Sequence, residues 1–151
     1  MATIKVFGRE TRTPGQKKNY KNDDALEKVI RYIFRENMEN EKDLIPELSG
    51  GYGVDLSSTR TVTDGMQMIK TIYGKTGGRQ LWHFSVNLSA DETAQISDLK
   101  EFAYEICGYY GNEYQTVFAG HRKIEDGREW IHFHVCCNSV SYETGKKMSM
   151  R

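Results

Sequence analysis

The chain has 151 residues, a length that predicts a single domain. Lys and Arg together number 21, as do Asp and Glu, so the net charge is zero and gives no support to nucleic-acid binding. Hydrophobic residues make up 38% and charged residues 28%, which argues against a disordered chain, and no apolar run is long enough to span a membrane. The polar amino-terminus does not resemble a signal peptide, and three cysteines, two of them adjacent, do not make a disulfide framework. We therefore expect a cytoplasmic protein.

Helical and strand-like patterns follow one another irregularly along the chain. In order, they predict a strand over 2–7, a basic loop over 9–21, a helix from about 22 to 34, a linker over 37–50, a glycine-rich turn over 49–53, a helix over 58–73, a strand over 80–88, a helix from about 89 to 110, and strands over 114–121 and 130–138. This order lacks regular strand–helix–strand alternation. It predicts an α+β fold.

The strand predicted over 130–138 has one apolar and one polar face. Side chains alternate across a strand, so His132, His134, Cys136 and Asn138 share the polar face. Two imidazoles one strand repeat apart, at about 6.7 Å between Cα atoms, can converge on one metal ion.

A predicted hairpin brings a third histidine to the same face. Asp126-Gly127 between two strand-like runs is a strong signal for a two-residue turn. The register that this turn sets places His121 directly opposite His132, with His134 one diagonal step away. A slip of one residue would send His121 to the opposite face. The hairpin therefore predicts a metal site made of the three histidines.

Other interpretations of the histidines stay open. They could form a polar cluster without an ion, or Cys136 could complete a closed zinc site with three imidazoles and one thiolate. We prefer an open site in which water or substrate oxygens complete the coordination. Imidazole ligands do not choose among Zn, Mn and related metals.

A tyrosine of the first predicted helix is turned away from the apolar stripe. At 100° per residue, Tyr32 lies roughly 130° from the centre of that stripe. It shares the outer face with Lys28 at i−4 and Arg35 at i+3. A partly exposed surface tyrosine without a role is the alternative.

Several of these segments resemble one superfamily. His132-Phe133-His134 resembles the metal motif of the HUH endonucleases, and an upstream His121 with the tail 138–147 resembles conjugative relaxases, the mobilisation proteins of plasmids and integrative elements. Segments 25–33 and 77–84 match as well, so the resemblance covers about 22–147. The tyrosine precedes the metal motif here, which is the relaxase order.

The resemblance implies a fold, a reaction and a set of site residues. The fold would be a central antiparallel sheet with helices packed on one face and the metal site on the other. Tyr32 would be the nucleophile that nicks single-stranded DNA at an origin of transfer, with accessory relaxosome proteins as further partners. His121, His132 and His134 would hold a divalent ion, Mn or Mg, with Zn as an alternative. DNA contacts would come from Lys28, Arg35, Arg79, His83 and Asn138.

Two departures from the family pattern stand out. Relatives often carry an acid two residues after the first histidine, where this chain has Lys123. Relaxases normally continue past the histidine motif, so residues 1–151 would be a nuclease domain truncated at its carboxyl end. Two other functions remain open: a phosphodiesterase in which metal-bound water attacks, and a non-catalytic DNA-binding module with a structural zinc.

Overall fold

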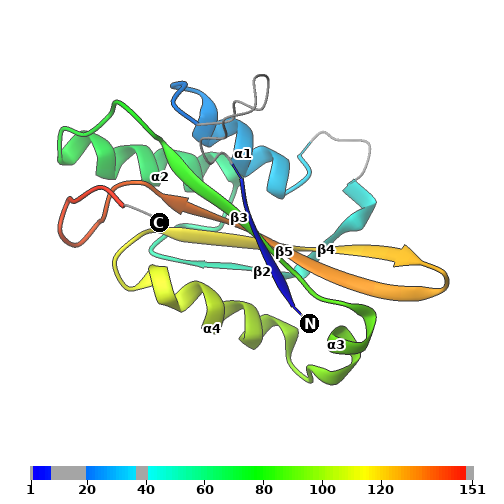
Figure 1. The fold of residues 1–151 in the computed structure, drawn as a ribbon. Helices are drawn as coiled ribbons and strands as arrows, with labels where there is room; N and C mark the ends of the chain where they lie inside the picture. Colours follow the sequence, from blue (N-terminus) through cyan, green and yellow to red (C-terminus); the bar gives the residue numbers. More distant parts are fainter. Residues whose placement is uncertain (1, 8–19, 37–40, 149–151) are drawn as a thin grey trace, which may run out of the picture.

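The computed structural model describes residues 2–7, 20–36 and 41–148 (Figure 1). Within them the strands are β1 Thr3–Phe7, β2 Leu44–Tyr52, β3 Leu81–Asn87, β4 Thr116–Glu125 and β5 Arg128–Asn138. The helices are α1 Ala25–Ile33, α2 Thr59–Ile72, α3 Ala90–Gln95 and α4 Leu99–Gly111, with a short 3-10 helix at Glu41–Asp43. The strands form one antiparallel sheet in the order β1-β3-β5-β4-β2. The predicted α+β fold with a central antiparallel sheet is confirmed. Most of the predicted basic loop, 9–21, lies outside the described residues.

Helices cover both faces of the sheet (Figure 1). On one face, α1 and α2 pack on the sheet through a cluster that includes Leu26, Met66 and Val117. On the other, α4 packs through a cluster that includes Cys107 and Phe118. The expectation that helices would cover one face only is wrong. Alternate residues of the central strands are apolar on both faces, so each face needs a cover.

The histidines lie on the face that α1 covers. His121 shares its side of β4 with Val117 and Ala119, and both of these pack in the cluster around α1. The expectation that the histidine site would lie on the face opposite the helices is therefore wrong as well. The carboxyl end of α1 comes close to the site instead.

The hairpin between β4 and β5 has the predicted register. Its turn is Asp126-Gly127, with φ of 54° and 73°, the left-handed pair that a tight two-residue turn requires. His121 is paired with His132. The turn chemistry alone therefore fixed the relative position of these two histidines.

Strand β2 replaces most of the predicted linker and the glycine-rich turn. It pairs with β4 at the edge of the sheet, and the register shifts between Ile45 and Ser49. Pro46 lies within this irregularity, where a missing backbone N–H is tolerated. A Cβ atom at Gly50 would collide with the hydroxyl of Tyr104. The glycine therefore lets α4 lie close over the strand.

The helix predicted from about 89 to 110 is two helices. Ser89 caps α3 in a capping box with Glu92, and the Asp98 side chain accepts a hydrogen bond from the Glu101 N–H at the start of α4. None of the helices in the described ranges is long and apolar enough to cross a membrane.

Candidate active site

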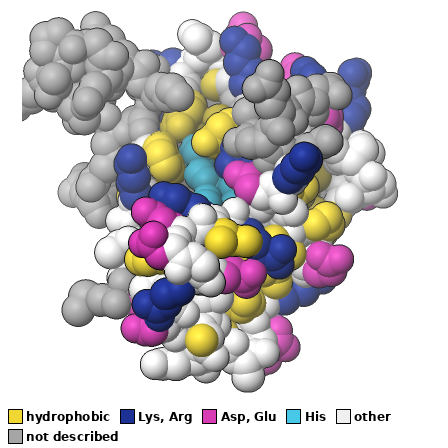
Figure 2. All heavy atoms as spheres, turned by 90° about the vertical axis from the view of Figure 1, so that its right-hand side faces the viewer, with side chains coloured by type: hydrophobic (Ala, Val, Ile, Leu, Met, Phe, Trp, Pro, Cys, Tyr) yellow, Lys and Arg dark blue, Asp and Glu magenta, His cyan; other side chains and the backbone are white. Residues whose placement is uncertain are grey.

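Three imidazoles converge where β4 and β5 run beside α1. The possible ligand atoms of His121, His132 and His134 all lie within 4.8 Å of one another. Their ring centroids are 4.7 to 5.3 Å apart. His121 and His134 are buried and His132 is partly exposed. Figure 2 shows histidine atoms at the surface, framed by hydrophobic, basic and acidic side chains. The predicted meeting of the three side chains is confirmed.

Hydrogen bonds fix which nitrogen of two of the rings can coordinate an ion. Nε2 of His121 lies 2.6 Å from the carbonyl oxygen of Ile33, so Nε2 carries the proton and Nδ1 keeps its lone pair. Nδ1 of His134 lies 2.9 Å from Nε2 of His83, which leaves Nε2 of His134 for an ion. Partners of this kind orient the ligands of metal sites.

Burial keeps these imidazoles neutral, which is the form that binds metals. It lowers the pKa of His121 to about 4, although the hydrogen bond to Ile33 opposes the shift. It also lowers the pKa of His134 to about 2, with the neighbouring His83 adding to the effect. The pKa of His132 is lowered too, by burial and then by Arg35. Three neutral nitrogen donors, two of them oriented by hydrogen bonds, fit a divalent ion.

Cys136 does not join this group. Among the described residues, the cluster with metal-ligand spacing contains the three histidines alone. Cys136 is buried, and burial raises the pKa of its thiol, which disfavours the thiolate that zinc requires. The closed site of three imidazoles and one thiolate is therefore absent from the described residues.

Tyr32 lies beside the histidines. It comes from the last turn of α1, whose opposite side buries Leu26 and Ile30, and the residue is 40% exposed. Its ring meets the His134 ring edge-on, at 90° and 5.7 Å between centroids. The structure thus places the predicted nucleophile next to the predicted metal ligands.

Arg35 is turned inward and does not share the outer face of α1. The helix ends at Ile33, and Arg35 adopts a left-handed conformation with φ of 55°. The N–H of Glu36 donates to the carbonyl of Arg31 at 2.9 Å. This hydrogen bond completes a Schellman motif, in which Arg35 occupies the C′ position that is usually glycine. Helical i+3 geometry therefore does not apply to Arg35, and only 5% of the residue is exposed.

The Arg35 guanidinium makes three contacts at the site. Its Nε and Nη2 donate to the two carboxylate oxygens of Asp43 at 3.0 and 3.1 Å. Nη2 also lies 3.1 Å from Nδ1 of His121. The guanidinium stands over the Tyr32 ring at 4.7 Å from its centroid. One cation thus links the nucleophile to a metal ligand.

Asp43 is the acidic group at the site, and sequence reasoning missed it. It immediately precedes Leu44, which pairs with His121. Its negative charge opposes the lowering of the pKa of His121 and His132. Lys123, at the position where relatives carry an acid, forms an exposed ion pair with Glu125. No signal pointed to Asp43, because β2 was not predicted.

The other predicted DNA contacts fall into three environments. Lys28 is exposed and pairs with Asp24 at 3.0 Å. Arg79 is partly exposed, with its guanidinium 3.7 Å from the centroid of the Trp82 ring. His83 is buried behind His134.

Asn138 is part of a buried network. Its amide donates to the carbonyl of Met66 and to Gln115, both at 2.9 Å, and its oxygen accepts from Lys70. With no exposed surface, Asn138 ties β5 to α2 in this structure and does not face DNA. The predicted DNA contact at this residue is therefore not supported by its position.

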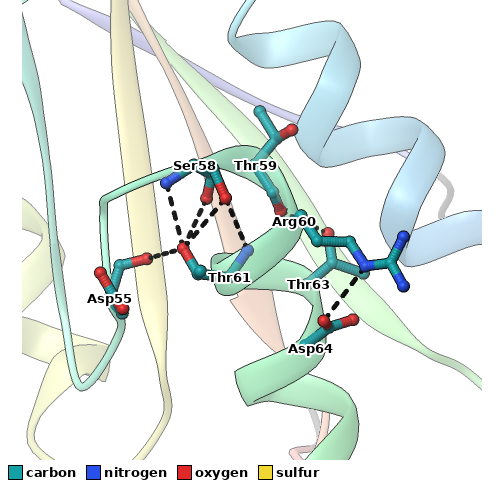
Figure 3. Close-up of polar contacts among 7 residues, drawn as sticks. All are labelled: Asp55, Ser58, Thr59, Arg60, Thr61, Thr63 and Asp64. Atoms are coloured by element: carbon teal, nitrogen blue, oxygen red, sulfur yellow. Dashed lines mark hydrogen bonds and ion pairs between the residues drawn. The ribbon is translucent and has the colours of Figure 1, made fainter.

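A cavity of about 750 Å³ opens beside the inward turn of Arg35. It is lined by Phe34, Arg35, Glu36, Lys42, Leu44, Leu56, Ser58, Thr59 and Val62. Its far wall is the start of α2, where Ser58 and Thr61 cap the helix reciprocally (Figure 3). The Thr61 hydroxyl also donates to the carbonyl of Asp55, which ties the preceding loop to the cap. The cavity thus lies between the hydrogen-bonded start of α2 and the guanidinium of Arg35.

Comparison with known proteins identifies the family. No curated protein matches the chain significantly. The sequence profile of one family, described as "Relaxase: MobA/VirD2-like, nuclease domain", matches residues 18–151, a range that contains Tyr32 and all four histidines. Because this match covers most of the chain, the protein belongs to the relaxase family, as a nuclease domain of the MobA/VirD2-like type.

Proposed function

We propose that this relaxase domain nicks and rejoins single-stranded DNA at an origin of transfer, with Tyr32 as the nucleophile. The observation that carries the proposal is the position of Tyr32 against the histidine cluster. A nucleophile and a site for a charge-stabilising ion must lie within reach of the same phosphate. Here Tyr32 and the histidine cluster both lie at the carboxyl end of α1.

The reaction is a transesterification. The Tyr32 oxygen attacks phosphorus, the bond to the 3′ oxygen breaks, and the products are a 5′-phosphotyrosine and a free 3′-hydroxyl. The covalent bond preserves the energy of the phosphodiester, so the reverse attack by a 3′-hydroxyl rejoins a strand. The phenolic proton leaves for solvent as the new bond forms, and the departing 3′ oxygen takes up a proton from solvent, so the protons balance.

His121, His132 and His134 would hold a divalent ion, Mn or Mg, with Zn as an alternative. Such an ion polarises the scissile phosphate and offsets its developing charge. The protein's own part is to orient the imidazoles, through the Ile33 carbonyl and through His83. Arg35 holds the Tyr32 ring by a cation–π contact.

DNA would be held by cations and aromatic rings around the nucleophile. Lys28 lies one helical turn before Tyr32, and Arg79 stands between the rings of Tyr20 and Trp82. Base stacking and phosphate contacts together bind single strands with little sequence preference. The cavity beside Arg35 and Lys42 offers a place for the nucleotide next to the scissile phosphate. Affinity should fall steeply with salt.

One gel experiment tests the proposal. The protein is incubated with Mn²⁺ or Mg²⁺ and with single-stranded oligonucleotides that tile the DNA around its gene, and the products are resolved under denaturing conditions. A protein–DNA adduct that disappears in Tyr32→Phe supports the proposal. Cleavage without an adduct would favour the metal-water phosphodiesterase, and tight binding without cleavage would favour the non-catalytic module. Either of these two results contradicts the proposal.

A further inference from the structure

The coordinating nitrogen of His121 already has a cationic partner. Because Nε2 donates to the Ile33 carbonyl, Nδ1 is the nitrogen left for an ion. Nη2 of Arg35 lies 3.1 Å from that same nitrogen and points a donor at its lone pair. An ion bound at Nδ1 and the hydrogen bond from Arg35 would use the same lone pair, so the two are mutually exclusive.

The chain holds Arg35 in this place at an energetic cost. The residue adopts a left-handed backbone conformation, where a side chain is disfavoured and glycine is the usual choice. In addition, Nη1 of Arg35 is buried without a hydrogen-bond partner among the described residues. Strain of this kind gathers at functional sites.

We propose that Arg35 is a built-in competitor of the divalent ion at His121. The ion displaces Nη2 from Nδ1, while the Asp43 carboxylate and the Tyr32 ring keep the guanidinium beside the site. The inference rests on the proposed metal site and adds a residue that sets its affinity. No covalent step is involved.

Once the ion displaces it, the Arg35 guanidinium is placed to bind the scissile phosphate. Nη2 loses one acceptor when the ion takes His121, and Nη1 has no partner before that. Both donors then lie beside the Tyr32 ring, where the scissile phosphate must come. Arginine donors in a fork match phosphate oxygens. Ion binding and phosphate binding are thereby coupled through one side chain.

The direct test measures Mn²⁺ affinity without DNA, by calorimetry on the full chain. Arg35→Gln removes the competing cation, and we expect it to bind Mn²⁺ about tenfold more tightly than the wild type. Arg31→Gln is the matched control. Arg31 is a cation of the same helix end, and it is paired with Glu27 and Glu36. Among the described residues, no hydrogen bond or ion pair joins its side chain to the histidines. We expect less than a twofold change there.

The outcomes separate this inference from the proposed function. If Arg35→Gln binds Mn²⁺ no more tightly than Arg31→Gln does, Arg35 does not compete with the ion, and the metal site itself still stands. If the wild type and both variants bind no Mn²⁺, the metal site and the competition both fall. A merely structural role for Arg35 predicts unchanged or weaker binding in Arg35→Gln.

A second measurement does not depend on the stability of any variant. The wild type is titrated with Zn²⁺, which is diamagnetic, and the arginine side-chain nitrogen resonances are followed by NMR. The Arg35 signals should shift in step with those of His121, and those of Arg31 should not. Arg35 signals that stay constant while His121 responds would overturn the inference.

Discussion

The ring of Tyr32 meets the imidazole of His134 edge-on, with 5.7 Å between their centroids. Tyr32 belongs to the first helix, α1, and His134 to the last strand, β5. Packing of α1 on β4 and β5 creates this proximity, because the buried stripe of α1 fixes the rotation of the helix over the sheet.

Loss of the Tyr32 hydroxyl should abolish strand transfer and spare DNA binding. Tyr32→Phe keeps the ring that packs on Arg35 and His134, so we expect single-strand affinity within about threefold of the wild type and no covalent adduct. Tyr109→Phe is the matched control, since Tyr109 is 81% exposed on α4, on the other face of the sheet. A filter-binding titration and a denaturing gel measure the two properties. Equal loss of the adduct in both variants would contradict the assignment.

His83 should act on the metal through His134. In the tautomer that leaves Nε2 of His134 for an ion, Nδ1–H of His134 donates a hydrogen bond to Nε2 of His83, and this hydrogen bond orients the ligand. We therefore expect His83→Phe to weaken Mn²⁺ binding by about 10–100-fold, the range typical of such partners. His83→Gln, whose amide oxygen can accept the same hydrogen bond, should restore part of the affinity. Calorimetry distinguishes these cases, and identical affinities for all three proteins would show that His83 has no such effect.

Sequence reasoning found the parts of the site that follow from local rules. The alternation of β5 and the Asp126-Gly127 turn were sufficient to place three histidines together, because strand period and turn geometry are fixed by a few residues. The inward position of Arg35 could not be predicted in this way. It depends on a left-handed ending of α1 at a residue that is not glycine. Propensity rules would continue the helix there.

Strand β2 was missed for a related reason. Its sequence contains Pro46 and two adjacent glycines, which are typical of a turn. Tertiary contacts override that preference, since the glycines allow α4 and Val54 to come close. Missing β2 concealed Asp43, whose position depends on it. For Asn138, the strand periodicity predicted which face of β5 the residue occupies. It could not predict the hydrogen bonds to Lys70 and Met66 within which the residue is buried.

The close approach of α4 to β2 makes Gly50 sensitive to substitution. A Cβ there would collide with Tyr104 and with Phe118, which pack against each other. Overpacking of this kind costs about 1–3 kcal/mol, so Gly50→Ala should lower the free energy of unfolding by that amount. Gly77→Ala is the control, because no atom of the described residues lies within 4 Å of a Cβ at Gly77. Urea denaturation measures both. If Gly50→Ala were as stable as the control, β2 would not lie where the structure has it.

Lys70 should make the free energy of unfolding depend on pH in the alkaline range. Burial lowers its pKa from the ordinary 10.5 to about 8, so between pH 8 and 10.5 the unfolded chain binds more protons at this residue than the folded one. The stability that Lys70 contributes is therefore present above pH 10.5 and lost as pH falls through about 8. Relative to Lys70→Met, the wild type should gain about 2 kcal/mol of unfolding free energy from pH 7.5 to pH 10. Parallel stability curves for the two proteins would rule out this effect.

Mapping the covalent bond tests the central claim most directly. The adduct formed with a cleaved oligonucleotide and Mn²⁺ is digested with trypsin and nuclease, and the peptides are identified by mass spectrometry. A nucleotide phosphate attached to the peptide that contains Tyr32, with the fragmentation placing it on that residue, is the predicted result. A phosphate on another tyrosine, or cleaved DNA with no modified peptide, would contradict the assignment of Tyr32 as the nucleophile.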